Sequence, residues 1–256
     1  MYFTTAEITA WVGALLWPFL RISAMLIAAP LFGAGTVSVR IRVGMAFILA
    51  LVVAPLIPTP PAVEPLSLAG LAIAVQQVVI GASIGFILQM VFSALTQAGE
   101  SIALSMGLGF ASMVDPQQGV QVPVVSTYFV IMATLMFLAL NGHVAMIELT
   151  LQSFYTMPIA VDGLARADLW ALVSWGSTMF VYGLLVAMPA VASMLLVNLS
   201  MGVITRAAPQ LNIFAVGFPM MIMLGFILLM ITIPVLMPQF TELLANAFEL
   251  MGRITS

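Results

Sequence analysis

The sequence predicts an all-α integral membrane protein made of several helical segments. Hydrophobic residues form 63% and charged residues 6% of its 256 residues, and the mean hydropathy is +1.23. A water-soluble domain carries about 25% charged residues. The apolar runs are long and continuous, whereas the strands of a transmembrane barrel are short and alternate apolar with polar residues. We therefore expect helices rather than a barrel.

The few charged residues exclude further classes of function. The chain has six Arg, no Lys and nine acidic residues, for a net charge of −3. It therefore has no basic surface for nucleic acid and no polybasic segment for lipid headgroups. It has no Cys and a single His, so we expect no disulfide, no metal and no other cofactor. No basic residue precedes the first apolar run, and we expect the N-terminus to be retained rather than cleaved.

Proline, glycine and polar residues divide the chain, treated as a single domain over residues 1–256, into apolar helical segments. The expected segments are residues 11–32, 43–57, 66–95, 122–140, 144–155, 169–197 and 211–237. A proline-rich connector is predicted at 55–65, and a polar connector around Asp162, Arg166 and Asp168. Segment 43–57 is shorter than the roughly 20 residues that cross a bilayer. The side of the membrane on which the later arginines lie depends on whether segment 144–155 crosses the bilayer, so the topology stays open.

The end of the chain predicts an amphipathic helix over residues 241–254. Its apolar residues Leu243, Leu244, Ala247, Phe248 and Met251 share one face, and Glu242, Asn246, Glu249 and Arg253 share the other. This pattern is typical of a helix that lies at an interface or packs on another subunit.

Arg21 lies deep within the first apolar segment, between Pro18 and Pro30. An arginine in such a place contacts a protein partner or extends its guanidinium group toward the membrane surface. The sequence leaves both interpretations open.

The stretch 97–119, QAGESIALSMGLGFASMVDPQQG, has no sustained helical period. Its apolar residues Met106, Leu108, Phe110, Met113 and Val114 alternate with small residues, Gly107 and Gly109 among them, and Asp115 and Pro116 follow. Irregular backbone at membrane depth is tolerated only where protein or a water-filled cavity surrounds it. We therefore expect a flexible apolar loop inside a protein-lined passage, with the methionines able to adapt to a passing surface.

Gly81, Ser83 and Gly85 match the pattern G-x-S-x-G of a hydrolase nucleophile elbow, for which His143 could be the base. That elbow requires a strand-to-helix turn, whereas these residues lie inside a long helical run. The same residues make a small-residue stripe on which another helix can pack closely. We expect the packing role, and no enzyme.

Glu100, Asp115 and Glu148 are acids near or within apolar segments, a pattern found in ion and proton paths. Their spacing provides no relay, and Asp-Pro is a common turn pair. Turn-forming, capping or inter-subunit pairing roles are expected instead.

Three motifs occur in order along the chain: the stretch 97–119, the run FLALNGH with Asn141, Gly142 and His143 at its end, and RAAPQLNIFAVGFP beginning at Arg206. Together they resemble the FliR family of flagellar biosynthetic proteins, part of the bacterial type III export gate, from one end of the chain to the other. The resemblance implies kinked helical hairpins in a helical assembly. It also implies a plug loop near 106–122.

The resemblance further implies partners and a location. FliP- and FliQ-type subunits would form with this chain an entry portal for unfolded flagellar proteins, with FlhB- and FlhA-type subunits nearby. The site would be the bacterial inner membrane at the flagellar basal body. A virulence-secretion export-gate subunit is an alternative within the same class.

The main alternative from another class is a small-molecule or ion transporter. It predicts an internal repeat with broken helices at matching positions, whereas the sequence has one broken stretch without a second copy.

Overall fold

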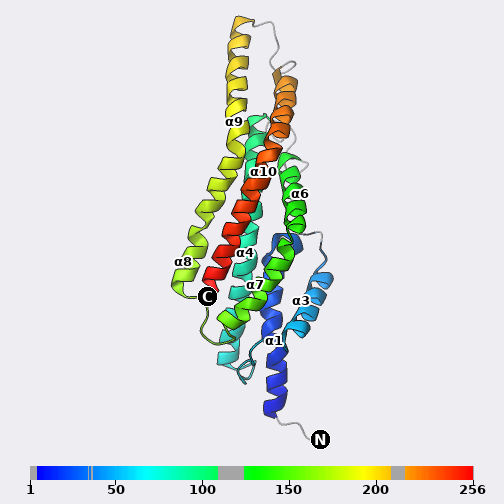
Figure 1. Cartoon of the computed structure of the whole chain (residues 1–256), viewed down its shortest axis with the longest axis vertical. Coiled ribbons are helices and arrows are strands. Elements are labelled where there is room, and N and C mark those ends of the chain that lie inside the picture. Colours follow the sequence, from blue (N-terminus) through cyan, green and yellow to red (C-terminus); the bar gives the residue numbers. More distant parts are fainter. Residues whose placement is uncertain (1–4, 34, 36, 109–123, 209–216, 256) are drawn as a thin grey trace. The chain divides into compact units, whose positions relative to one another are not determined.

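The computed structural model describes residues 5–33, 35, 37–108, 124–208 and 217–255, and every regular element in these ranges is helical (Figure 1). The helices are α1 Thr5–Ala28, α2 Pro30–Gly33, α3 Val39–Val53, α4 Leu68–Ser105, α6 Val124–Ala139, α7 Gly142–Thr156, α8 Arg166–Ser174, α9 Gly176–Ala207 and α10 Phe218–Ile254. The all-α prediction is confirmed.

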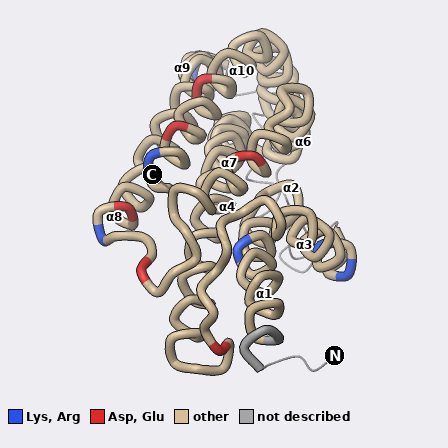
Figure 2. Tube along the Cα trace, turned by 60° about the horizontal axis from the view of Figure 1, so that its bottom comes forward, with Lys and Arg blue, Asp and Glu red and all other residues tan. Residues whose placement is uncertain are grey.

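Four helical stretches in the described ranges are long and apolar enough to cross a membrane: Thr9–Ala28, Leu68–Ser105, Arg166–Ala207 and Phe218–Ile254. The pair α6 and α7 would make a fifth, bent by 65° at its break. Charged residues are sparse along the whole trace (Figure 2). The chain is thus a multi-pass membrane protein by length and composition.

The chain packs as two compact units. The first contains Met1–Met90, Phe137–Gly176 and Leu244–Ser256, and the second contains Val91–Met136 and Ser177–Leu243. Helices α4 and α10 contribute residues to both. In the first unit, Phe19 of α1 meets Phe47 of α3 edge to face at 6.4 Å. In the second, Phe92 of α4 meets Phe240 of α10 in the same way at 6.2 Å.

Helix α4 continues to Ser105, although the sequence predicted its end at residue 95 and a break from 97. Gly99 lies inside the helix, and the absence of a side chain there allows a close contact with α6. Ser101 and Ser105 are compatible with a helix because their hydroxyls donate to the carbonyls of Gln97 and Ser101, both at 2.9 Å. The irregular stretch therefore begins at Met106, later than predicted.

Helix α10 is continuous from Phe218 to Ile254 with Pro234 and Pro238 inside it, so the separate helices predicted at 211–237 and 241–254 are one. A proline removes one backbone hydrogen bond, and a long apolar helix can tolerate this loss. In its last turns, Leu243, Leu244, Ala247 and Met251 of the predicted apolar face are buried, and Glu242, Glu249 and Arg253 of the predicted polar face are exposed. Phe248 and Asn246, one from each face, are both half-buried.

Other boundaries shift for local reasons. Helix α3 starts four residues before the predicted 43, because the Ser38 hydroxyl accepts the amide of Ile41 at 3.4 Å as an N-cap. It ends at Val53, close to Pro55, which disfavours helix in the residue before it. The connector predicted around Arg166 and Asp168 is partly helical, as α8. The proline-rich connector before α4 carries no helix, as predicted.

Candidate functional site

Helix α4 ends at Ser105 and is closed at Gly107, within the predicted plug segment. Gly107 has a φ of 80°. Its amide donates to the Leu104 carbonyl at 3.0 Å, and the Leu108 amide donates to the Ala103 carbonyl at 3.1 Å. These two bonds form a Schellman motif, in which a left-handed residue closes a helix. Because a side chain at such a φ costs about 1–3 kcal/mol, glycine fixes where the helix stops.

Met106 anchors this end of α4 on α10. Its side chain is fully buried. A Cβ built on Gly225 of α10 would lie 2.5–2.8 Å from the Cγ, Cε and Sδ atoms of Met106. The thioether therefore fills the space that the glycine leaves open, and α4 and α10 approach closely at this point.

Helix α6, which follows the predicted plug segment, is also fixed to α4. A Cβ on Gly99 of α4 would lie 2.6 Å from the Cα of Ser126, so the two backbones touch. The Ser126 hydroxyl donates to the Thr96 carbonyl at 3.2 Å. From α9, the Asn198 side-chain amide donates to the Ser105 carbonyl at 3.4 Å. The residues on both sides of 109–123 therefore belong to one packed set of helices.

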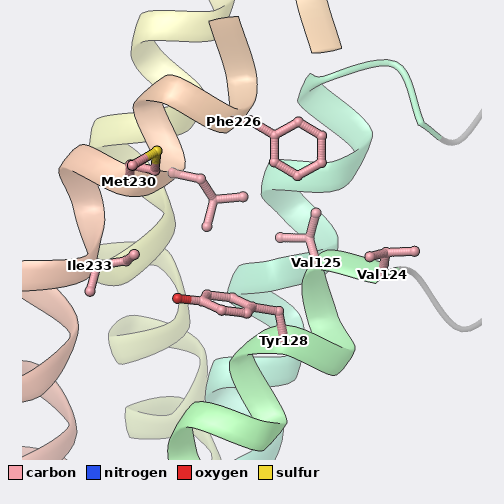
Figure 3. A pocket seen from close by; sticks show the side chains of 7 residues that line it. Val124, Val125, Tyr128, Phe226, Met230 and Ile233 are labelled. Carbon is pink, nitrogen blue, oxygen red and sulfur yellow. The ribbon is translucent and has the colours of Figure 1, made fainter. Parts of the chain in front are cut away.

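An apolar cavity of about 270 Å³ lies between α6 and α10 in the second unit (Figure 3). It is lined by Val124, Val125, Tyr128, Phe226, Leu229, Met230 and Ile233. The Tyr128 hydroxyl points toward α10 in Figure 3 and is the one polar side-chain group of this lining. Val124 places the cavity next to the point where α6 begins. Such an apolar wall gives an ion nothing to replace its hydration shell.

In the first unit, α1 and α4 are in backbone contact along the small-residue stripe. A Cβ on Gly81 would clash with the carbonyl oxygen of Arg21 and lie 2.9 Å from its carbonyl carbon. A Cβ on Gly85 would lie 2.5 Å from the Met25 carbonyl oxygen and 2.7 Å from the Ala28 Cβ. The two helices run parallel here, because Gly81 faces Arg21 and Gly85 faces Met25. Glycine at these positions is required by the approach of backbone rather than of side chains.

Arg21 joins three helices of the first unit through its side chain, which is fully buried. Its Nε donates to Gln77 Oε1 of α4 at 2.8 Å. Its Nη1 donates to the Ser153 carbonyl at 2.8 Å and to the Ser153 hydroxyl at 3.0 Å, and Nη2 donates to the Met157 carbonyl at 2.9 Å. The guanidinium also lies 4.1 Å from the ring centroid of Phe154.

The charge of Arg21 meets the C-terminal end of α7 rather than an acid. Ser153 and Met157 carry carbonyls of its last turn and C-cap, and the Ser153 carbonyl also accepts the Met157 amide at 3.0 Å. A helix C-terminus bears a partial negative charge that favours a cation. Arg21 therefore caps α7, and of the two interpretations that the sequence left open, contact with protein groups is the one that holds. In the sequence, Arg21 could be noticed only as an arginine inside an apolar run. Its hydrogen-bond partners lie 56, 132 and 136 residues away, and the sequence alone does not identify them.

Comparison with known proteins agrees with this architecture. The family model described as "Bacterial export proteins, family 1" matches residues 12–247. A protein named flagellar biosynthetic protein FliR from Pectobacterium carotovorum is 37% identical, over 98% of this chain and 96% of its own length. Proteins of the same name from Escherichia coli and Bacillus subtilis are 36% and 32% identical, over 99% and 94% of this chain and 97% and 94% of their own lengths. The chain belongs to the FliR family.

The predicted plug residues of this FliR-family chain fall in two groups. Met106, Gly107 and Leu108 are described and form the end of α4. Gly109, Phe110, Met113, Val114, Asp115 and Pro116 lie outside the described residues. The structure therefore defines how the segment is attached on both sides.

The Asn141-Gly142-His143 motif forms the bend between α6 and α7. Asn141 has a φ of 54°, in the left-handed region that Asn tolerates better than most residues. A Cβ on Gly142 would lie 2.5 Å from the Phe137 ring. His143 starts α7, and its Nδ1 is buried without a hydrogen-bond partner within the described part of the chain. The motif thus forms the break between the helical segments that the sequence predicted at 122–140 and 144–155.

The remaining predicted residues occupy separate places. Glu100 is exposed on α4, and Arg206 is exposed in the last turn of α9, where a cation favours the helix dipole. Ser83 lies in the interior of α4, and its hydroxyl donates to the Val79 carbonyl at 2.8 Å. The nucleophile-elbow interpretation is therefore wrong. Among the described residues, no group of three His, Cys, Asp or Glu could hold a metal.

Proposed function

We propose that this chain is the FliR-type subunit of the flagellar type III protein export gate in the bacterial inner membrane. With FliP- and FliQ-type subunits it forms the entry portal for unfolded flagellar proteins, next to FlhB- and FlhA-type subunits at the basal body. The segment that begins at Met106 and includes Gly109, Phe110, Met113 and Val114 closes the pore. The names of the relatives support the flagellar role.

One observation carries the plug proposal: the segment is attached at both ends to one packed set of helices. On the α4 side, the Schellman motif at Gly107 and the contact of Met106 with Gly225 fix the chain. On the α6 side, the backbone contact of Gly99 with Ser126 fixes it again. A segment held this way can change its conformation without the surrounding helices moving.

Apolar side chains can both block ions while the pore is shut and let an unfolded chain pass when it opens. A ring of apolar groups excludes water, and with it ions, while the pore is shut. Methionine has three rotatable bonds and a polarizable sulfur, so it can adapt to an entering segment of any sequence. The cavity of about 270 Å³ lined by apolar side chains includes Val124, where α6 begins.

The test changes the chemistry of the segment and keeps its length. Complexes carrying Phe110→Ser with Met113→Ser are compared with complexes carrying Phe110→Leu with Met113→Leu. Ion conductance of reconstituted complexes and secretion of a flagellar substrate by cells are measured in parallel. We expect the serine pair to raise closed-state conductance several-fold while the complex stays assembled.

The leucine pair is the matched control because it removes the same two side chains but keeps the surface apolar. It should remain near the wild-type conductance. Equal conductance for the serine and leucine pairs would contradict a seal made by these residues. A failure of secretion with unchanged conductance would assign the segment to substrate passage alone.

A further inference from the structure

The free face of helix α4 changes its chemistry along the helix. In the first half of α4 the large exposed side chains are apolar, and Val75 and Phe86 are 61% and 46% exposed. Between Ile87 and Ala103 the pattern reverses, since every buried residue there is apolar or glycine. Every exposed or half-buried residue of this stretch is polar: Gln89, Ser93, Thr96, Gln97, Glu100 and Ser101. The second half of α4 therefore has the polar outer face of a helix that meets water.

Two other long helices of the second unit have apolar outer faces. Leu195 and Leu199 of α9 are 61% and 69% exposed, and Met230 of α10 is 71% exposed. Such side chains suit lipid or the apolar surface of another subunit. The polar face is thus a property of α4 and not of the exposed surface of this unit in general.

Glu100 excludes lipid as the surroundings of the α4 face. Serine and threonine can satisfy their hydroxyls within their own helix, as Thr96 does by donating to the Phe92 carbonyl at 3.0 Å. The exposed Glu100 carboxylate has no hydrogen bond or ion pair within the part of the chain that the structure describes. A carboxylate in an apolar membrane helix faces protein or a water-filled cavity.

The position of Glu100 in the chain favours water over protein. Glu100 precedes Met106 by six residues, a rise of about 9 Å along the helix. Met106 and Gly107 hold the near end of the segment that we propose as the plug. A segment that closes a passage is attached beside that passage, and the polar face of α4 lies within two helical turns of the attachment.

We propose that the face of α4 from Gln89 to Glu100 lines the water-filled passage of the export gate and contacts the unfolded substrate. This inference rests on the proposed function and deepens it. Polar side chains keep the passage hydrated and exchange hydrogen bonds with the backbone of a passing chain, whatever its sequence. Glu100 supplies a fixed negative charge on the wall near the plug.

The test exploits the absence of cysteine from the chain, so that each substitution introduces a single thiol. Ser93→Cys and Thr96→Cys are placed in the complex with its co-expressed subunits, reconstituted in nanodiscs that leave both membrane sides open to reagents. We measure the rates of modification by a cationic and an anionic methanethiosulfonate. Both thiols should react. Leu199→Cys of α9 is the matched apolar position and should react at least about tenfold more slowly, because apolar surroundings suppress the thiolate.

The charge of the reagent tests Glu100. Thr96 lies one turn before Glu100, and at this separation of about 6 Å a carboxylate in water should favour the cationic reagent about fivefold over the anionic one, relative to a free thiol. Glu100→Gln should abolish the preference, whereas Glu100→Asp should keep most of it. The same preference in Thr96→Cys with and without Glu100→Gln would overturn the place of this carboxylate on the passage wall.

Secretion of a flagellar substrate by cells separates this inference from the proposed function. If secretion requires the chain but neither thiol reacts, or all three positions react equally, the inference fails and the proposed function stands. If the thiols react but their modification in cells leaves secretion unchanged, the face meets water away from the substrate route, which also overturns the inference. Secretion that does not require the chain would refute the proposed function and this inference with it.

Discussion

Two helix contacts depend on glycine for different reasons. They are the contact of α1 with α4 in the first unit and the contact of α4 with α10 in the second. Gly81 faces the backbone of Arg21, and Gly225 faces the Met106 side chain at its Cγ, Cε and Sδ atoms. Backbone held in a helix cannot move aside, whereas a thioether can rotate. The first contact is therefore rigid, and the second can adapt.

The surroundings of the two contacts show the same difference. The α1–α4 contact is reinforced by a buried guanidinium that binds Gln77, Ser153 and Met157. The second unit has an apolar cavity of about 270 Å³ and the end of α4 at Gly107. By these contacts, the first unit is the more rigid of the two.

Among substitutions that leave the complex assembled, the largest effect is expected from Arg21→Met. The substitution keeps a long flexible side chain but leaves Gln77 Oε1 and the Met157 carbonyl without the guanidinium donor, whereas the Ser153 carbonyl keeps the Met157 amide. Buried unsatisfied groups cost about 1–3 kcal/mol each. Thermal unfolding of the purified complex should shift downward by on the order of 10 °C.

Arg21→Lys is the matched variant. Its single ammonium group keeps the charge but cannot reach Gln77, Ser153 and Met157 together, so an intermediate loss is expected. If Arg21→Met unfolds at the wild-type temperature, the guanidinium does not hold the three helices together.

Gly81→Ala should come next, with a loss of about 1–3 kcal/mol, because the added methyl group forces α1 and α4 apart. Gly81→Leu should prevent assembly. Ser83→Ala is the control two positions away, where the lost hydroxyl bonds only to Val79 of its own helix; it should change stability by about 0.5 kcal/mol or less. The amount of assembled complex recovered from membranes measures the effect of each variant. A greater loss of complex with Ser83→Ala than with Gly81→Ala would contradict the packing role of this stripe.

Gly107→Val tests the helix stop. We expect a smaller loss of stability than for Gly81→Ala, because strain on the order of 1 kcal/mol at this φ is relieved in part by the neighbouring chain. Its main result should be slower substrate secretion, because α4 can no longer end in the Schellman motif. Gly107→Asn should retain most of the rate, since Asn tolerates the left-handed region. Identical secretion by the two variants would show that the φ of 80° is not what matters at Gly107.

The smallest effect is expected from Gly225→Ala. Its new methyl group meets the Met106 thioether, which can rotate, so the loss of stability should be below about 1 kcal/mol. Combining it with Met106→Ala should show non-additive losses, as for any residues in contact. Gly202→Ala, where a Cβ would have no atom within 4 Å, should be neutral or slightly stabilising. A larger loss for Gly225→Ala than for Gly81→Ala would reverse the comparison of the two regions.

Composition and apolar runs were sufficient to predict the helical membrane architecture, and the Asn141-Gly142 pair identified the bend between α6 and α7. The predicted break at residue 97 was wrong because Gly99 can serve either as a helix stop or as a packing contact. Only the position of Ser126, from a distant part of the chain, decides between them. The predicted separation of 211–237 from 241–254 was wrong for a similar reason, since tolerance of the backbone bond lost at a proline depends on the whole helix.

The candidate site was predictable to the extent that its signals are local. Gly107 and Met106 were identified within an unusual stretch of sequence. The role of Gly107 as a helix stop depends on amide and carbonyl geometry that the sequence does not display. The bonds of Arg21 depend on helices α4 and α7, which lie far along the chain. A sequence can show that an arginine needs partners, but the fold determines which groups they are.

Closed-state ion conductance after deletion of residues 109–114 tests the central claim most directly. The deletion removes the predicted seal and leaves the described ends of the segment, Leu108 and Val124, in place. If the helices form a rigid frame around a movable plug, the complex should remain assembled and its conductance should rise well above the wild-type closed level. A wild-type closed level in an intact complex would contradict the account and make this segment only a structural connector.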